Sequence, residues 1–222
     1  EFILAATRLS GQALKYAAEE LRRDKAFVFA AVKINADVLR YASEDLRANR
    51  EIALAAVQED GYALEHVDEE LRNDKAVVLA AVREDGHALE FASQRLQNDW
   101  FVVLAALEQT GCAIVYAAEE LRRDRRFILE AVKLNGRVVT YVADEFKIFD
   151  SEIILAAAQQ LLSTILDRRG PELEGTLTCL ASLVQFGCAR RIANEHESLL
   201  KCLSRHQNEA RTRTAVISIF EQ

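Results

Sequence analysis

The sequence predicts an all-α protein, an α-solenoid of stacked short antiparallel helical hairpins with a C-terminal helical cap. The first observation is a period of 25 residues, and the second is that each period holds one amphipathic and one mostly apolar segment. Six repeats begin in turn at Gly11, Ala36, Gly61, Gly86, Gly111 and Gly136. Units of this size bury their apolar faces by stacking on their neighbours, so we expect a solenoid that serves as a binding scaffold.

The first half of a repeat predicts an amphipathic helix. In residues 11–22, Leu14, Ala17 and Leu21 recur on one face at helical spacing, with charged residues such as Lys15 and Glu19 opposite them. This pattern predicts one continuous helix of about three turns in each repeat.

The second half of a repeat predicts a more buried helix. Asp24 stands where an N-cap is needed, and residues 27–32 are apolar on nearly every side. Four later repeats place the equivalent cap at Asn49, Asp74, Asp99 and Asp124. We expect the glycine that opens the next repeat to end this helix in a left-handed conformation, with Ala36 as a departure that makes one turn tighter.

Two stretches carry a family resemblance: residues 71–89 (LRNDKAVVLAAVREDGHAL) and 121–135 (LRRDRRFILEAVKLN). They resemble a short helical domain of unknown function with the pattern LRxDxxVVLAAVxxNGxALxYAS. Such domains occur in tandem in secreted effectors of intracellular bacteria and in proteins of unicellular algae. The resemblance covers roughly residues 1–160 and implies the architecture, but it brings no activity and no catalytic residues.

The period ends after the sixth repeat. Residues 151–169 predict one long helix, which Gly170 and Pro171 stop. We therefore divide the chain into a repeat solenoid at 1–169 and a C-terminal helical cap at 170–222, because a terminal repeat must close the core with a different outer face. Within the cap, residues 177–220 are weakly similar to an armadillo-type unit.

The sequence starts partway through a repeat. Residues 1–10 align with 26–35, so the chain begins inside a repeat, and we expect the natural protein to extend further upstream.

Composition limits the partners and the compartment. The 222 residues are 50% hydrophobic and 28% charged, and 28 basic against 35 acidic residues give a net charge of −7, which argues against nucleic acid as the partner. No apolar run is long enough to span a bilayer. The cysteines lie singly, so we expect free thiols in an intracellular, reducing compartment, with cytosol and organelle both open. They are Cys112, Cys179, Cys188 and Cys202.

Three groupings of residues come near a chemical site. His196 and Glu197 resemble the opening of a zinc-protease helix, but Leu200 stands where the second histidine belongs. Cys202 and His206 are four residues apart and lack a third ligand, so a core thiol beside a surface imidazole is the favoured interpretation.

His87 and Cys112 hold the same position in successive repeats and are expected to be neighbours. That position also holds Gln12, Asp37, Tyr62 and Arg137, so we interpret it as a variable position. No nucleophile, base and orienting acid can be assembled from these residues, and we expect no enzyme activity, no cofactor and no metal site.

Departures from the repeat mark the candidate partner-binding residues. Trp100 and Phe101 replace polar or small residues at the start of a helix, and Val115 replaces a charged one. Together with an irregular turn in the sixth repeat, they predict an apolar strip over repeats four to six. Trp100 packing on its own repeat or on the cap is the alternative. The full set is Trp100, Phe101, Val115, Ile148, Phe149, Tyr62, His87 and Arg137.

These observations favour a non-enzymatic helical-repeat scaffold that binds another protein along the face of the first helices. The main alternative is an accessory structural subunit of a large multi-protein assembly, for example an organellar, photosynthetic or respiratory one. An RNA-binding repeat protein is the third hypothesis. A free scaffold should be monomeric when isolated, whereas an assembly subunit should aggregate without its partners.

Overall fold

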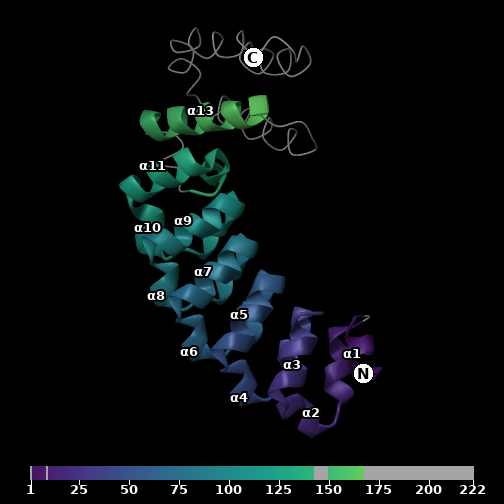
Figure 1. Ribbon diagram of the computed structural model, residues 1–222. Coiled ribbons are helices and arrows are strands. Elements are labelled where there is room, and N and C mark those ends of the chain that lie inside the picture. The colour runs from purple at the N-terminus through teal and green to yellow at the C-terminus, as the bar shows by residue number, and fades with distance from the viewer. Residues whose placement is uncertain (1, 9, 143–149, 168–222) are drawn as a thin grey trace. The chain divides into compact units, whose positions relative to one another are not determined.

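The structure is a computed structural model that describes residues 2–8, 10–142 and 150–167 (Figure 1). The chain divides into two compact parts, an N-terminal part, Glu1–Ala118, and a C-terminal part, Glu119–Gln222. All regular elements within the described ranges are helices. The predicted all-α repeat architecture is confirmed.

The N-terminal part repeats a 3₁₀-helix, a short α-helix and a longer α-helix. After α1 (Phe2–Thr7), its elements are η1 (Gly11–Tyr16), α2 (Glu19–Arg23), α3 (Lys25–Val32), η2 (Ala36–Tyr41), α4 (Glu44–Arg47), α5 (Arg50–Glu59), η3 (Gly61–His66), α6 (Glu69–Arg72), α7 (Lys75–Glu84), η4 (Gly86–Phe91), α8 (Gln94–Gln97), α9 (Trp100–Gln109) and η5 (Gly111–Tyr116).

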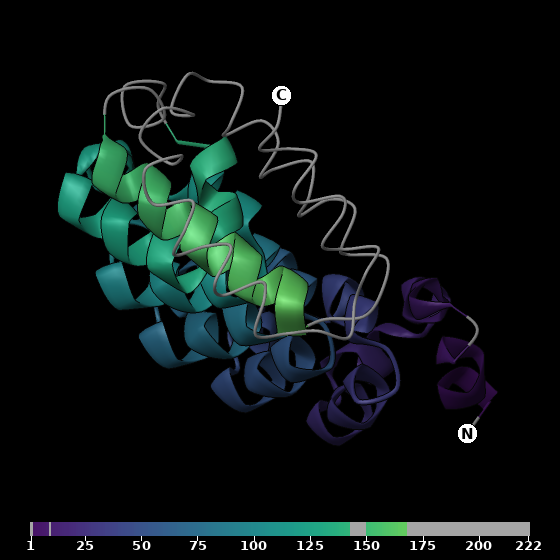
Figure 2. The ribbon, with the colours of Figure 1, turned by 90° about the horizontal axis from the view of Figure 1, so that it is seen from above.

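Two layers form the N-terminal part. The longer helices α3, α5, α7 and α9 follow one another side by side, while η1 to η5 contact each other in the same order (Figures 1 and 2). The short helices α2, α4, α6 and α8 connect the layers at one end. Apolar side chains between the layers are fully buried, among them Leu39, Ile52, Leu64 and Val78.

The prediction of one continuous first helix in each repeat is wrong. η1 ends at Tyr16, Ala17 and Ala18 are extended with ψ of 154° and 150°, and α2 then begins at Glu19. In the later repeats, the residue at the Ala18 position uses its backbone amide to bond to the preceding repeat. The amide of Ser43 donates to the carbonyl of Arg22 at 3.0 Å. The same bond recurs from Asp68 to Arg47, from Ser93 to Arg72 and from Ala118 to Gln97.

The predicted N-caps of the longer helices are confirmed. Asp99, for example, accepts hydrogen bonds from the amides of Phe101 at 3.0 Å and Val102 at 3.2 Å. The same role falls to Asp24, Asn49, Asp74 and Asp124. These bonds satisfy amides that a helix leaves without an internal partner.

The glycines that open the repeats do not take the predicted left-handed conformation. Gly61 lies outside that region, and the residue before it, Asp60, is extended and caps η3. A Cβ atom at Gly61 would lie 2.6 Å from the carbonyl oxygen of Ala81 in α7. Glycine is therefore needed because the following repeat packs closely here.

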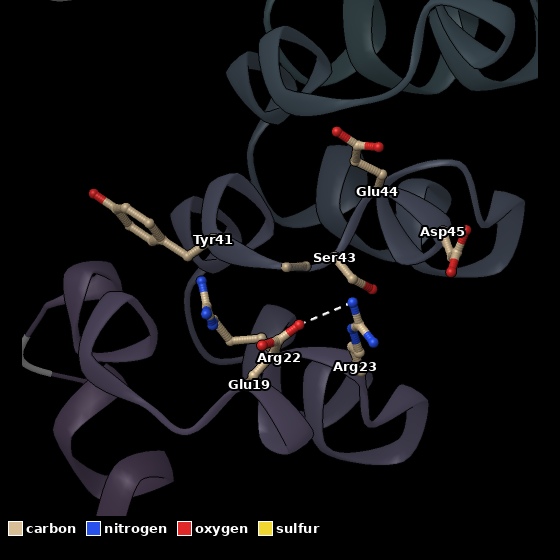
Figure 3. A pocket seen from close by; sticks show the side chains of 8 residues that line it. Glu19, Arg22, Arg23, Tyr41, Ser43, Glu44 and Asp45 are labelled. Atoms are coloured by element: carbon tan, nitrogen blue, oxygen red, sulfur yellow. Dashed lines mark ion pairs between the residues drawn. The ribbon is translucent and has the colours of Figure 1, made fainter.

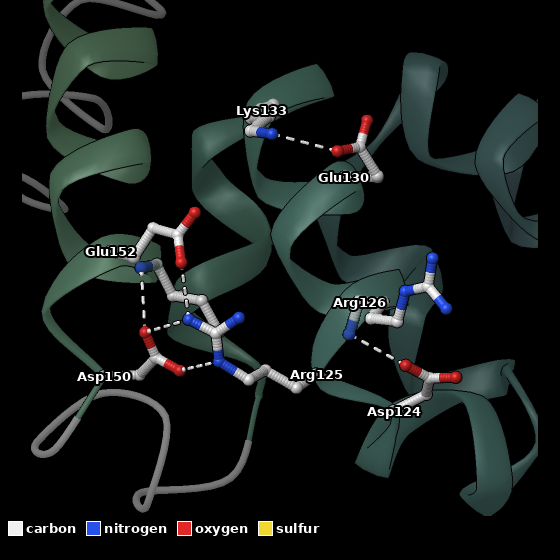
Figure 4. A network of polar contacts seen from close by, with 8 residues as sticks. Asp124, Arg125, Arg126, Glu130, Lys133, Asp150 and Glu152 are labelled. Atoms are coloured by element: carbon white, nitrogen blue, oxygen red, sulfur yellow. Dashed lines mark hydrogen bonds and ion pairs between the residues drawn. The ribbon is translucent and has the colours of Figure 1, made fainter.

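The C-terminal part contains α10 (Glu119–Arg123), α11 (Arg125–Leu134), η6 (Gly136–Thr140) and α13 (Ser151–Asp167). The long helix predicted after the sixth repeat is confirmed as α13, which packs on α11 and η6. Arg125 binds Asp150 and Glu152 at the start of α13, with 2.6 Å between Nη2 of Arg125 and Oε2 of Glu152 (Figure 4). The predicted cap at 170–222 lies outside the described residues.

None of the helices in the described part of the chain combines the length and the apolar character needed to cross a bilayer.

Candidate functional site

Two positions of the η helices carry the unusual side chains of the N-terminal part. The second position varies in chemistry, and its occupants are Gln12, Asp37, Tyr62, His87 and Cys112. The last position is aromatic in every repeat, and its occupants are Tyr16, Tyr41, His66, Phe91 and Tyr116. Because η3, η4 and η5 lie side by side, side chains 25 residues apart come into contact.

Four of these rings form an aromatic cluster, defined as Tyr62, His87, Phe91 and Tyr116. The Tyr62 ring is stacked with His87, with centroids 6.4 Å apart, and meets Phe91 edge to face at 5.9 Å. The His87 ring meets Tyr116 edge to face at 6.4 Å. The Tyr62 side chain remains 42% exposed and the other three residues are half-buried. The cluster therefore lies at the surface of the protein and is not part of the core.

The cluster lies in a negative electrostatic environment. Partial burial raises the pKa of Tyr62, and the carboxylates of Asp85 and Glu90 raise it further. Burial also raises the pKa of Tyr116, and Glu90 adds to this effect. A nearby negative charge disfavours a phenolate, and it favours any cation that approaches the same rings.

The predicted proximity of His87 and Cys112 is confirmed. Cys112 Sγ lies 3.2 Å from His87 Nε2 and 3.0 Å from Thr110 Oγ1. On the other side of the imidazole, His87 Nδ1 lies 2.9 Å from Asp85 Oδ1. Four side chains at two successive boundaries between repeats therefore form one hydrogen-bonded chain. Across the described ranges, no three His, Cys, Asp or Glu side chains converge as a metal site would require.

Phe101 and Trp100 lie at the start of α9. Phe101 is 71% exposed, and the Lys75 ammonium lies 5.4 Å from the centroid of its ring. Trp100 is half-buried. Sequence alone does not separate these adjacent aromatics, but the structure shows that Phe101 is the more exposed of the two.

The remaining candidate residues are distributed more widely. Val115 is 44% exposed on η5, next to Tyr116 of the aromatic cluster. Arg137 is exposed on η6 in the C-terminal part. Ile148 and Phe149 lie outside the described residues. The apolar strip over repeats four to six therefore stays a prediction.

Sequence reasoning missed Phe91 and Tyr116 as site residues. The signal was present, because an aromatic residue closes the η helix of each repeat. A ring that recurs in every repeat is usually explained by stacking, because such a residue is expected to be buried between repeats. The structure instead leaves these rings half-exposed beside Tyr62.

A pocket of about 240 Å³ lies between α2, η2 and α4 (Figure 3). Its walls carry both signs of charge, and Arg23 Nη2 pairs with Glu19 Oε1 at 2.8 Å. Within the described residues, Arg22 Nε is buried without a hydrogen-bond partner, as are the same atoms of Arg47 and Arg72. Because three successive repeats share this buried arginine Nε atom, it is a property of the repeat and does not mark a ligand site.

Comparison with known families supports the repeat assignment. The family described as Domain of unknown function (DUF4116) matches the chain four times, at residues 1–47, 49–97, 74–122 and 99–147. The last three matches begin 25 residues apart, so each one spans about two repeats and overlaps the next. No curated protein and no solved structure matches the chain.

Proposed function

Because the chain belongs to the DUF4116 family of tandem helical repeats, whose function is unknown, we propose that it is a non-enzymatic scaffold that binds a protein partner through the aromatic cluster. The observation that carries this proposal is the contact of Tyr62 with both His87 and Phe91 on an exposed face. Rigid, partly exposed rings on a helical scaffold are typical anchors of a protein interface.

The surroundings of the cluster favour a basic partner segment. Burial raises the pKa of Tyr62 most, and the nearby charges of Asp85, Glu90 and Asp60 raise it further. A lysine or arginine of the partner would lie over an aromatic face and near a carboxylate at the same time. The same carboxylates would repel a phosphate backbone, which favours a protein partner over RNA.

Val115 supports this location for the contact. Its position in the two preceding repeats holds Glu65 and Glu90. The surface beside the aromatic cluster therefore changes from acidic at η3 and η4 to apolar at η5. A basic segment that also carries an apolar residue would match both ends of the surface.

The test is affinity purification from the native source with quantitative mass spectrometry. The bait is the full chain, as wild type, Tyr62→Ala/Tyr116→Ala, Phe101→Asp, or Tyr16→Ala as the matched control. Tyr16 is 80% exposed and holds the Tyr116 position in η1, so its removal deletes a surface ring away from the cluster. We expect the Tyr62→Ala/Tyr116→Ala variant to lose a protein partner that the Tyr16→Ala variant retains.

Two further outcomes would contradict the proposal. A partner that is lost only with Phe101→Asp would place the interface on α9 beside Lys75. A partner retained equally by all four chains would show that neither aromatic surface is used. Retention that weakens with added salt and is lost with Glu90→Lys would support the basic segment specifically.

A further inference from the structure

We propose that Cys112 is a site of thiol–disulfide exchange, with His87 as the base that takes the thiol proton and a small neutral or cationic disulfide as the reactant. This inference is independent of the partner proposed above, because it concerns a covalent reaction of the isolated chain. It rests on the geometry of the four side chains Thr110, Cys112, His87 and Asp85.

The hydrogen bonds fix the direction of proton transfer. Asp85 Oδ1 accepts from the backbone amide of His87 at 2.8 Å and lies 2.9 Å from Nδ1 of the same residue. A carboxylate is only an acceptor, so Nδ1 carries the ring proton and Nε2 is left as the acceptor. The thiol of Cys112 donates to that nitrogen across 3.2 Å.

Thr110 completes the arrangement at the sulfur. With the thiol proton directed at His87, the Thr110 hydroxyl donates to Sγ across 3.0 Å. The same donor would stabilise the sulfur once it becomes a thiolate. The sequence alone does not assemble a nucleophile with a base and an orienting acid, but the structure brings His87, Asp85 and Thr110 together at the Cys112 sulfur before any reactant binds.

The repeat register explains how these residues come together. Asp85 and Thr110 hold the position that precedes an η helix, where the side chain normally accepts from an amide two residues ahead, as Asp60 does for Tyr62 at 2.9 Å. Thr110 makes no such cap and contacts the Cys112 sulfur instead. The boundary between the third and fourth repeats therefore supplies Asp85 and His87, and the next boundary supplies Thr110 and Cys112.

The exchange is balanced by the residues present and the disulfide. His87 Nε2 takes the proton from Cys112, and the thiolate attacks one sulfur of the disulfide. A bond forms between Cys112 Sγ and that sulfur, the original S–S bond breaks, and the leaving thiolate takes the proton from His87. No other oxidant is required, because the disulfide itself is reduced to the released thiol.

Access and charge define the reactant class. Cys112 is half-buried, and the His87 and Asp85 side chains are about one-third exposed, so a small molecule reaches the sulfur from the surface. The carboxylates of Asp85 and Glu90 act on this region, since they add to the rise that burial causes in the pKa of Tyr62. They favour a cationic disulfide such as cystamine over the anionic disulfide of glutathione.

The experiment measures the rate of mixed-disulfide formation with cystamine at pH 7. Peptide mass spectrometry on the full chain separates Cys112 from Cys179, Cys188 and Cys202. We expect His87→Gln and Asp85→Ala each to slow the reaction of Cys112 by about tenfold or more. Gln already occupies the His87 position at Gln12, which makes His87→Gln compatible with the repeat.

The matched control for Asp85→Ala is Asp60→Ala. Both substitutions remove the cap of an η helix, but only the first removes the contact with His87. We expect Asp60→Ala to react within twofold of wild type. Equal slowing by the two variants, or an unchanged rate with His87→Gln, would overturn the proposal.

A second measurement, the tautomer of the His87 ring, is made first on the wild-type chain, so its main result does not depend on whether a variant folds. The ¹⁵N chemical shifts of the His87 ring report its tautomer, and we expect the proton on Nδ1. A proton on Nε2 would remove the acceptor for the Cys112 thiol and would overturn the mechanism. In Asp85→Ala, the ring should shift towards the Nε2–H tautomer, because the carboxylate that holds Nδ1–H is gone.

Discussion

Lys75 Nζ lies 2.7 Å from Oδ2 of Asp99, the residue that caps the longer helix of the following repeat. The preceding repeat forms the same link, where Arg50 Nε lies 2.8 Å from Asp74 Oδ2. In the C-terminal part, Arg125 pairs with Asp150 in the same way. In these three repeats the first residue of the longer helix is thus bound to the cap of the next longer helix. Trp100 holds the same position in α9, with an indole in place of the cation.

The N-cap hydrogen bonds of Asp99 should contribute more to the free energy of unfolding than its ion pair with Lys75. Asp99→Ala removes the acceptor of two backbone amides as well as the partner of Lys75, so we expect a loss of about 1–2 kcal/mol in the free energy of unfolding. Lys75→Met removes the partly exposed ion pair and the contact of the ammonium with the Phe101 ring, and should cost less, about 0.5–1 kcal/mol. Urea unfolding of both variants measures the difference, and equal losses would contradict a dominant role for the cap.

Acid should destabilise the fold through the same caps. The hydrogen bond from Arg50 lowers the pKa of Asp74 most, burial opposes it, and the amides of Ala76 and Val77 lower it further. A carboxyl whose pKa is lower in the folded state stabilises the fold above its unfolded pKa of about 3.9. That stabilisation is lost as the pH falls from there through the folded pKa.

The measurement is the free energy of unfolding in urea at pH 7, 4 and 3 for wild type and Asp74→Asn. Asn49 caps α5 with its side-chain oxygen, so asparagine at position 74 should keep the cap while removing the charge. We expect a smaller loss of stability between pH 4 and pH 3 in this variant. The same pH dependence in both chains would show that Asp74 does not contribute.

The caps could be predicted from sequence, whereas the break in the first helix could not. An Asp or Asn at one fixed position before an apolar segment has a specific physical role, and Asp24 and Asp99 perform it. The break at Ala17 and Ala18 leaves no such signal, because the apolar spacing continues through it. What stabilises it is a backbone bond between repeats, as from Ser43 to Arg22, and backbone groups are the same in every residue.

The candidate site was predictable only in part for a similar reason. The period places His87 and Cys112 in successive repeats, and their contact follows from the register. The exposure of a ring depends on how the neighbouring repeat covers it, which is why Phe101 and Trp100 differ despite being adjacent. The role of Thr110 was also hidden, since a threonine before an η helix is an ordinary capping residue.

Gly61→Ala should be destabilising because of a steric clash. A Cβ atom there would lie 2.6 Å from the carbonyl oxygen of Ala81 and 3.0 Å from the amide nitrogen of Asp85, both backbone atoms. Forcing the two repeats apart should cost about 1–3 kcal/mol, as overpacking typically does. Urea unfolding measures this cost.

The control is Ala36, which holds the same register position and already carries a methyl group. Ala36→Gly should lower stability by about 1 kcal/mol at most, through the greater backbone freedom of glycine in the unfolded chain. If Gly61→Ala proved as mild as this control, close packing would not explain the glycine.

Ser43→Pro isolates the backbone bond that joins two repeats. Ser43 has φ of −61° and follows Ala42 with ψ of 159°, and proline fits both angles without strain. The substitution therefore removes the amide that donates to the Arg22 carbonyl at 3.0 Å and leaves the local conformation in place. Ser43→Ala is the control, since the Ser43 side chain forms no capping bond.

We expect Ser43→Pro to be about 1 kcal/mol less stable than Ser43→Ala, as the loss of one hydrogen bond implies. Proline also restricts the unfolded chain, which offsets part of that loss. Urea unfolding of the two variants gives the comparison directly. A proline variant as stable as the alanine variant, or more so, would mean that the bond between Ser43 and Arg22 does not hold the repeats together, and that side-chain packing alone sets their stacking.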